Sequence, residues 1–236
     1  MVKDLHALAG RGPYREVTRF VNRRISESLA FQPDDRFVDI GCGDGALLKL
    51  AIAKGIKTAV GFNATREEVD GFRGTTLDVR QGLSDSMSLP NGFATVVVCN
   101  SVLLIVPGEK IAASLREIAR ISQANARIWI GEIPRRQEPP NTPRHENVAQ
   151  MLWWLLRKRG FRTFLGMCRR LLSGDQRGAV LFNPLAAIYW AEPEDFVRLA
   201  EDAGLRCERH FPHQTLGEDL QPCEHPLRHD YVFRKA

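Results

Sequence analysis

The chain has 236 residues, of which 44% are hydrophobic and 26% charged, a balance typical of a globular protein that can bury a substantial core. Five scattered cysteines, the lack of a leader pattern and the lack of a long apolar run argue against a disulfide-stapled, secreted or membrane-spanning protein, so we expect a cytoplasmic one. The formal net charge is +5, but residues 147–172 hold six basic and no acidic residues, so the positive charge is concentrated in that segment.

Apolar segments with strand and helix periodicity alternate through the first half of the chain. An amphipathic helix is predicted over 13–31, and a short buried strand over 37–40 runs into a glycine-rich turn. The elements predicted after this turn are helices over 46–54, 65–72 and 109–121, and strands over 57–61, 78–82, 94–99 and 126–132. This alternation is typical of an α/β protein with a doubly wound parallel sheet, whose ligands bind beyond the carboxyl ends of the strands.

The pattern changes after Glu132. Four prolines between 134 and 143 predict an extended linker, residues 147–172 read as a basic helical segment, and a helix is predicted over 194–203. Two closing strands, 206–211 and 230–234, are expected to be joined by a long proline-rich loop. The predicted domain organisation is an N-terminal helical segment, a core, a basic helical insert or acceptor lid, and closing elements of the core, over 1–35, 36–133, 134–190 and 191–236.

The central motif is the stretch 38–45, with the sequence VDIGCGDG. Its glycines allow a tight turn and a close approach of the backbone to a ligand, and the helix that follows offers free N–H groups. Such a turn could by itself bind a dinucleotide, a phosphate or nothing. The GxGxG spacing, with Asp39 two residues before the first glycine, differs from the GxGxxG dinucleotide fingerprint.

With this motif the chain resembles the class I S-adenosylmethionine-dependent methyltransferases. Further stretches match that family in order, at 61–65, 85–90, 96–103 and in the L-x-E-I-x-R helix pattern that starts at Leu115. The resemblance covers about residues 36–133. It implies a Rossmann-like methyltransferase fold, a seven-stranded and mostly parallel sheet whose last strand is antiparallel, with a helical insert, and S-adenosyl-L-methionine as cofactor.

The resemblance also implies a set of cofactor-binding positions. They are Asp39, Gly41, Cys42, Gly43, Asn63, Ala64, Ser84, Asp85, Ser86, Asn100 and Ser101. In the family an acid at the position of Asn63 binds both ribose hydroxyls, and its replacement by an amide would weaken binding by about 1–2 kcal/mol. Asp85 falls where the family's acid accepts from the adenine amino group. The family's Gly-Gly after the patterned helix is replaced by Asn125 and Ala126.

The acceptor is less well defined by the sequence. Enzymes that methylate base amines carry an Asn/Asp-Pro-Pro-aromatic stretch after the fourth strand, whereas this chain has Asn-Ser-Val-Leu over 100–103, so we do not expect a nucleic-acid partner. A small-molecule, carbohydrate or lipid-linked acceptor is expected, methylated at oxygen. Such an acceptor needs a base. The candidate catalytic residues are His145, otherwise a solvated loop histidine, and Glu132, otherwise an acid that caps the linker turn.

Two other segments allow alternative interpretations. Residues 147–172 have three interpretations, namely a lid over the acceptor, a peripheral membrane contact, or a helix that only packs on the core. The late histidines match no known zinc spacing, so no metal is expected. A non-catalytic methyltransferase-like subunit, suggested by Asn63, and an RNA-modifying enzyme that uses the basic segment are the alternative functions. The acceptor's identity and the oligomeric state stay open.

Overall fold

The structure is a computed structural model that describes residues 15–135, 148–161, 164–165, 168, 189–217 and 219–236. The chain divides into two units, Met1–Gln137 with Ile188–Ala236, and Glu138–Ala187. The first unit holds a sheet with helices on both faces, and the second contains helix α6.

Seven strands form one sheet in the order β3-β2-β1-β4-β5-β7-β6. Their bounds are β1 Arg36–Ile40, β2 Thr58–Asn63, β3 Asp78–Gln81, β4 Ala94–Asn100, β5 Ser122–Pro134, β6 Leu205–Leu216 and β7 Pro222–Lys235. Neighbours from β3 to β5 are parallel, and β7 lies antiparallel to both β5 and β6. The predicted doubly wound, mostly parallel sheet with an antiparallel last strand is therefore confirmed.

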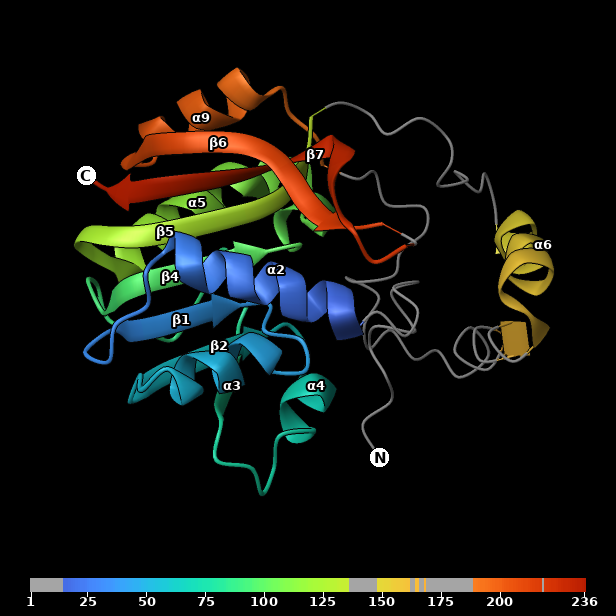
Figure 1. Cartoon of the computed structure of the whole chain (residues 1–236), viewed down its shortest axis with the longest axis horizontal. Helices are drawn as coiled ribbons and strands as arrows, with labels where there is room; N and C mark the ends of the chain where they lie inside the picture. Colours follow the sequence, from blue (N-terminus) through green and yellow to red (C-terminus); the bar gives the residue numbers. More distant parts are fainter. Residues whose placement is uncertain (1–14, 136–147, 162–163, 166–167, 169–188, 218) are drawn as a thin grey trace. The chain divides into compact units, whose positions relative to one another are not determined.

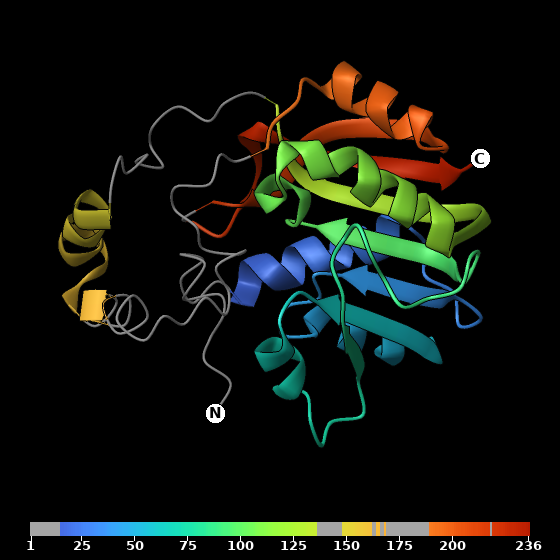
Figure 2. The ribbon, with the colours of Figure 1, turned by 180° about the vertical axis from the view of Figure 1, so that it is seen from behind.

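Helices cover the two faces of this sheet (Figures 1 and 2). Helices α2 (Arg15–Ser28) and α3 (Ala46–Ala53) pack on one face, and α5 (Gly108–Ile121) and α9 (Pro193–Asp202) pack on the other. The short helices are α4 (Arg66–Asp70) and the 3-10 turn η1 (Leu103–Ile105). Because both faces are covered at the centre of the sheet, β4 reads as a nearly continuous apolar run rather than as an alternating one.

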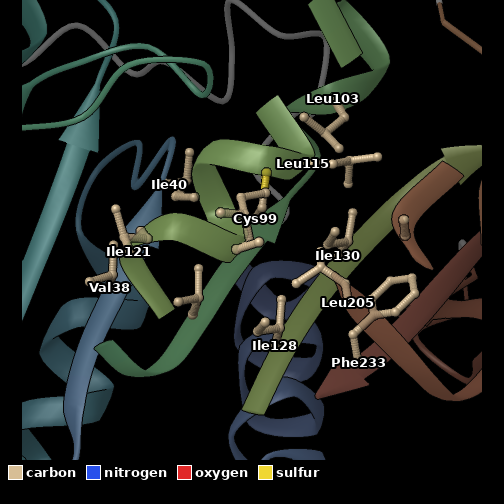
Figure 3. Close-up of a cluster of buried hydrophobic side chains, with 14 of the residues drawn as sticks. Val38, Ile40, Cys99, Leu103, Leu115, Ile121, Ile128, Ile130, Leu205 and Phe233 are labelled. Atoms are coloured by element: carbon tan, nitrogen blue, oxygen red, sulfur yellow. The ribbon is translucent and has the colours of Figure 1, made fainter. Parts of the chain in front are cut away.

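Strand β4 illustrates how the apolar runs fill both cores. Val97 and Cys99 point to the α5 side, whereas Val96 and Val98 belong to the α2 and α3 side. Figure 3 shows the cluster on the α5 side, where side chains of β1, β4 and β5 meet Leu115 of α5. The sheet is thereby packed on both of its faces.

The prediction of a long loop between the last two strands is wrong. Strand β6 continues to Leu216 and β7 begins at Pro222, so a long hairpin replaces most of the predicted loop. Pro212 lies at a register shift of β6, which is an edge strand, and Pro222 is the first residue of β7. Both are positions where a proline, which has no N–H, does not interrupt the ladder. The prolines therefore did not mark a loop.

Strand β5 also differs from its prediction, because it starts at Ser122 directly after α5 rather than at Ala126. Asn125 has a left-handed backbone with φ of 61°. Asparagine is among the residues that tolerate this conformation. This explains why Asn125 can replace the glycine that the methyltransferases resembled by this chain have at this position.

In the second unit, α6 spans Val148–Arg159 and ends before Gly160, whose φ of 84° is left-handed. The guanidinium of Arg157 lies 5.1 Å from the ring centre of Trp153. No helix among the described residues is long and apolar enough to cross a membrane. The linker predicted after Pro134 lies mostly outside the described residues, as does much of the predicted basic segment after Arg159.

Candidate functional site

The glycine turn between β1 and α3 is tied to β2. The backbone N–H groups of Gly41 and Cys42 both donate to the carbonyl of Phe62, at 2.8 and 3.0 Å. Gly41 and Gly43 have left-handed φ values of 72° and 56°. A Cβ at Gly41 would lie 2.3 Å from Val102, whereas one at Gly43 would meet nothing within 4 Å. The turn thus needs glycine at Gly41 for packing and leaves open space beside Gly43.

Asp39, at the carboxyl end of β1, is a buried acid with 5% of its surface exposed. Burial, and secondarily the charge of Asp44, raise its pKa to about 8. No side-chain hydrogen bond to Asp39 is formed by the part of the chain that the structure describes. An ionised carboxylate in this position would be stabilised by a cation, so Asp39 fits the cationic methionine end of the expected cofactor.

Asn63, at the end of β2, is buried and pairs with the glycine turn. Its Oδ1 accepts from the Gly43 N–H at 3.0 Å, and its Nδ2 donates to the Gly43 carbonyl at 3.1 Å. The Cys42 thiol lies 3.6 Å from the same Oδ1. Beside it, the Ala64 carbonyl accepts from Gln81 at 3.3 Å. The sequence placed Asn63 at a ribose-binding position, and the structure adds that its amide holds the turn.

The loop after β3 is anchored to α5. The Ser84 and Ser114 hydroxyls are 2.8 Å apart and buried, and the Asp85 carboxylate pairs with Lys110 at 3.1 Å. Ser86 is exposed, with its backbone bonded to Leu83. The predicted adenine-binding acid therefore has a cation of α5 beside it.

Glu117 and Arg120 of the L-x-E-I-x-R pattern hold the following part of this loop. Glu117 accepts from the backbone N–H of Met87 at 2.7 Å. Arg120 donates to the Met87 and Leu89 carbonyls, at 3.1 and 2.8 Å, and to the side chain of Asn91 at 2.8 Å. The hydrogen bonds from Arg120 lower the pKa of Glu117. The pattern is thus a clamp between α5 and the loop over 87–91.

The carboxyl ends of β4 and β5 carry a polar network. Asn100 donates to one Glu132 oxygen at 3.1 Å and accepts from the Trp129 indole at 3.1 Å. The other Glu132 oxygen accepts from Ser101 at 3.4 Å and from Arg228 of β7 at 2.6 Å. Ser101 and Glu132 are both left-handed, with φ of 60° and 62°. The structure therefore brings together three of the predicted residues, namely Asn100, Ser101 and Glu132.

The sequence analysis missed the residues of the hairpin that complete this network. Asp230 of β7 accepts from the Glu132 N–H at 2.9 Å and lies 2.9 Å from Nδ1 of His213 on β6. An acid directly before the apolar run Tyr231, Val232 and Phe233 was the available signal for Asp230. His213 lies in the segment that had been predicted as a loop, so its pairing with Asp230 could not be anticipated.

Other candidate groups are not part of this network. The ring centres of His210 and His229 lie 5.8 Å apart with the rings tilted by 39°, and burial lowers the pKa of His229. Among the described residues no group of three or more potential ligands could hold a metal ion. Burial raises the pKa of the Cys42 and Cys99 thiols, so both remain protonated. His145 lies outside the described residues.

Comparisons with known proteins agree with this geometry. A family model described as a methyltransferase domain matches residues 38–130. The chain is 30% identical over 130 residues to an indolepyruvate C-methyltransferase of Streptomyces griseus. This match covers 49% of the chain and 39% of the relative, so the chain spans about two fifths of the relative's length.

Solved structures share the fold. A SAM-dependent methyltransferase of Archaeoglobus fulgidus superposes with a TM-score of 0.62 at 15% identity, covering 98% of this chain and 100% of that one. A putative methyltransferase of Haloferax volcanii, solved in complex with the Trm112 methyltransferase activator, has a TM-score of 0.62 at 14% identity and covers 98% and 95%. Residues 38–130 are thus similar to a methyltransferase domain, and the seven-stranded sheet has the fold of solved S-adenosylmethionine-dependent methyltransferases.

Proposed function

We propose that this protein transfers the methyl group of S-adenosylmethionine to a small-molecule acceptor. The observation that carries the proposal is Asp39, a buried acid at the carboxyl end of β1 whose pKa is raised to about 8. Such a carboxyl costs stability when it ionises, unless a cationic ligand pairs with it. The ammonium of the methionine moiety is a ligand of that kind.

The residues around Asp39 fit the rest of the cofactor. The open space beside Gly43 admits a ligand close to the backbone of the turn. Asn63, Ala64 and the loop over 84–86 are the residues we propose for the nucleoside, and Asn100, the last residue of β4, and Ser101 are those we propose for the methionine end. When bound, S-adenosylmethionine supplies an electrophilic methyl group, so the protein's own task is to align an acceptor and accept its proton.

We propose that the acceptor is a small molecule, a carbohydrate or a lipid-linked molecule. The atom that receives the methyl group is proposed to be an oxygen. A second candidate is a carbon atom next to a carbonyl group, which the similarity to the Streptomyces griseus enzyme favours. Both atoms must lose a proton before or during methyl transfer, which an amine acceptor need not do at the protein. A buried polar network at the ends of β4 and β5 suits either one.

The insert is proposed to take part in acceptor binding. Helix α6 ends in Arg157, Lys158 and Arg159 and contains no acid, so it favours an anionic acceptor or the headgroups of a membrane surface. The residues expected from the sequence to accept the acceptor's proton are His145, on the same segment, and Glu132, which in the structure is paired with Arg228 and is proposed instead as a positioning residue. A measurable test is a shift in the acceptor's KM when Arg157 is changed to Gln.

The proposed function is tested by cofactor binding and by methyl transfer. Titration with S-adenosylhomocysteine at pH 8 should give micromolar or tighter binding in the wild type and at least tenfold weaker binding in Asp39→Asn. Asp34→Asn, an exposed acid before the same strand, is the matched control and should bind like the wild type. Transfer of a labelled methyl group is then measured to phenols, sugars and 3-indolepyruvate.

Each outcome separates the candidate functions. Absence of cofactor binding by folded wild type would refute the proposal. Binding without transfer to any acceptor of the panel would favour a non-catalytic subunit. Transfer to RNA, with an affinity for RNA that falls steeply with salt, would favour the nucleic-acid alternative.

A further inference from the structure

His213 and Asp230 form a buried pair on neighbouring strands of the C-terminal hairpin. Nδ1 of His213 lies 2.9 and 3.0 Å from the two Asp230 oxygens, and the side chains are only 5% and 2% exposed. Because a carboxylate can only accept, Nδ1 carries the proton that lies between them. In neutral His213 the other ring nitrogen, Nε2, is then the one with a lone pair.

Asp230 is itself held in place by a hydrogen bond from strand β5. Its Oδ1 also accepts from the backbone N–H of Glu132 at 2.9 Å. The Glu132 side chain is bound by Arg228 and by Asn100, so a continuous chain of hydrogen bonds joins His213 to the carboxyl end of β4. In doubly wound sheets this end is where ligands bind.

Two strained residues and a register shift lie at the same place. Ser101 and Glu132 have left-handed backbones that cost free energy in residues with a side chain, and the β5–β7 pairing shifts between Ile130 and Ile133. The Glu132 N–H reaches Asp230 within this irregular stretch of β5. Backbone strain of this kind persists where the surrounding structure fixes a particular geometry, and it is concentrated at functional sites.

The other described histidines of the hairpin lie in different surroundings. Nδ1 of His229 is buried without a hydrogen-bond partner among the described residues, and His210 is exposed. His225 lies near His213, with ring centres 6.4 Å apart, and its Nδ1 accepts from the backbone of Leu227. His213 is thus a histidine whose ring is oriented by a carboxylate of the neighbouring strand.

We propose that His213, oriented by Asp230, is the general base that accepts the proton of the methyl acceptor. This inference rests on the proposed function and deepens it. The acceptor's O–H, or C–H next to a carbonyl, gives its proton to Nε2, and the bonding pair stays on the oxygen or carbon. Attack by that pair on the methyl carbon displaces sulfur, which keeps the electrons of the broken carbon–sulfur bond. The imidazolium, stabilised by Asp230, then releases its proton to water.

The surrounding charges are consistent with this role. The groups that face His213 are the Asp230 carboxylate, His225, and the Glu132–Arg228 ion pair behind Asp230. Because Glu132 is bound to Arg228, Asn100 and Ser101, it acts as a positioning residue for Asp230. The base at this site therefore comes from the hairpin, and the acceptor is one whose attacking atom must be deprotonated.

The first experiment needs no acceptor. The protein is labelled with ¹⁵N-histidine, and the His213 signals, assigned by their loss in His213→Gln, are followed with pH in the presence of saturating S-adenosylhomocysteine or S-adenosylmethionine. The two ligands differ by one methyl group and one positive charge. If Nε2 faces the methyl group, the charge lowers the titration midpoint of His213 by about half a pH unit or more.

The second experiment measures methyl transfer to the panel acceptors. His213→Gln is expected to lower kcat by about 10²- to 10⁴-fold and Asp230→Asn by at least tenfold, with S-adenosylhomocysteine affinity within threefold of the wild type. His210→Gln, the same substitution at an exposed position of the same strand, is the control and should stay within about twofold. The wild-type rate should rise with pH as His213 loses its proton, and this limb should vanish in His213→Gln.

The two proposals fail in different ways. Wild type that binds neither ligand refutes the proposed function, and the inference falls with it. Ligand binding with identical His213 titration in the two complexes overturns the inference and leaves the proposed function intact. Full activity in His213→Gln also overturns the inference, whereas a lower midpoint with S-adenosylmethionine supports it even where no acceptor of the panel reacts.

Discussion

The side-chain amide of Asn63 exchanges two hydrogen bonds with the backbone of Gly43, accepting at 3.0 Å and donating at 3.1 Å. These two hydrogen bonds close the glycine turn, and an aspartate at position 63 could make only one of them. An aspartate at this position could accept from the Gly43 N–H, but it would place a second acceptor against the Gly43 carbonyl. The amide therefore has a structural role in this chain, apart from any contact to a ribose.

We expect Asn63→Asp to lower the free energy of unfolding by about 1–2 kcal/mol at pH 8. The substitution removes one buried hydrogen bond and adds a negative charge close to Asp39 and Asp44. The loss should shrink towards pH 4, where the new carboxyl is protonated and can donate. Urea unfolding at both pH values checks this, with Asn91→Asp as control because it keeps an acceptor for Arg120. Equal or higher stability at pH 8 would contradict the structural role of the amide.

Asp39→Asn is expected to stabilise the protein at high pH. Burial raises the pKa of Asp39 to about 8 in the folded state, against an ordinary value of 3.8 for an aspartate. The folded protein therefore binds the proton more tightly than the unfolded one, so its stability falls as pH rises from about 4 to about 8. Above pH 8, Asp39→Asn should be more stable by roughly 3–6 kcal/mol, because raising a pKa by about four units corresponds to at most about 1.4 kcal/mol per unit, and near pH 4 the two proteins should match. Thermal unfolding against pH measures the difference, and a destabilised variant at pH 9 would contradict it.

The same group should make cofactor binding pH-dependent. Only ionised Asp39 pairs with an ammonium, so the affinity for S-adenosylhomocysteine should rise about fivefold between pH 7 and pH 8, as the ionised fraction rises around a pKa of about 8. Binding should release a proton, which calorimetry detects as a dependence of the enthalpy on the buffer. In Asp39→Asn both effects should disappear, and their persistence would assign them to another group.

Much of the sheet could be predicted because its central strands are simple in physical terms. Val96, Val97 and Val98 are β-branched and covered on both faces, so they read as a strand without any tertiary information. The glycine turn was equally clear, since Gly41 and Gly43 adopt the backbone conformation that favours glycine. These local signals were sufficient to predict the central strands and the glycine turn between β1 and α3.

The acceptor side depends on pairings between distant strands. Pro212 and Pro222 suggested a loop, but their effect depends on where they lie in the ladder, at a register shift and at a strand start. Without that register His213 and Asp230, 17 residues apart, cannot be brought together. For Glu132 the position at the end of a strand was predicted, whereas its ion pair with Arg228 was not.

The clamp of α5 on the following loop gives a further prediction. Arg120→Ala removes bonds to the Met87 and Leu89 carbonyls and leaves the mostly buried Glu117 carboxylate without its partner. We expect the free energy of unfolding to fall by about 1–3 kcal/mol. Arg116→Ala, an exposed arginine of the same helix, should change it by about 0.5 kcal/mol or less. Glu117 has a lowered pKa, so its stabilising contribution is lost as pH falls below about 4.5, and this acid sensitivity should be weaker in Arg120→Ala.

Gly41 and Gly43 offer a matched pair of substitutions that separates folding from ligand binding. An alanine at Gly41 would put its Cβ 2.3 Å from Val102 on a left-handed backbone, so Gly41→Ala should lower the free energy of unfolding by about 2–4 kcal/mol. At Gly43 the same methyl group meets no atom within 4 Å, so Gly43→Ala should lower it by only about 1 kcal/mol, the cost of the left-handed backbone. The methyl group would instead fill the space proposed for the cofactor, and S-adenosylhomocysteine affinity should fall at least tenfold. Chemical denaturation and calorimetric titration measure the two effects separately. A Gly43→Ala protein that binds the ligand like the wild type would mean that the cofactor does not approach the turn at this residue.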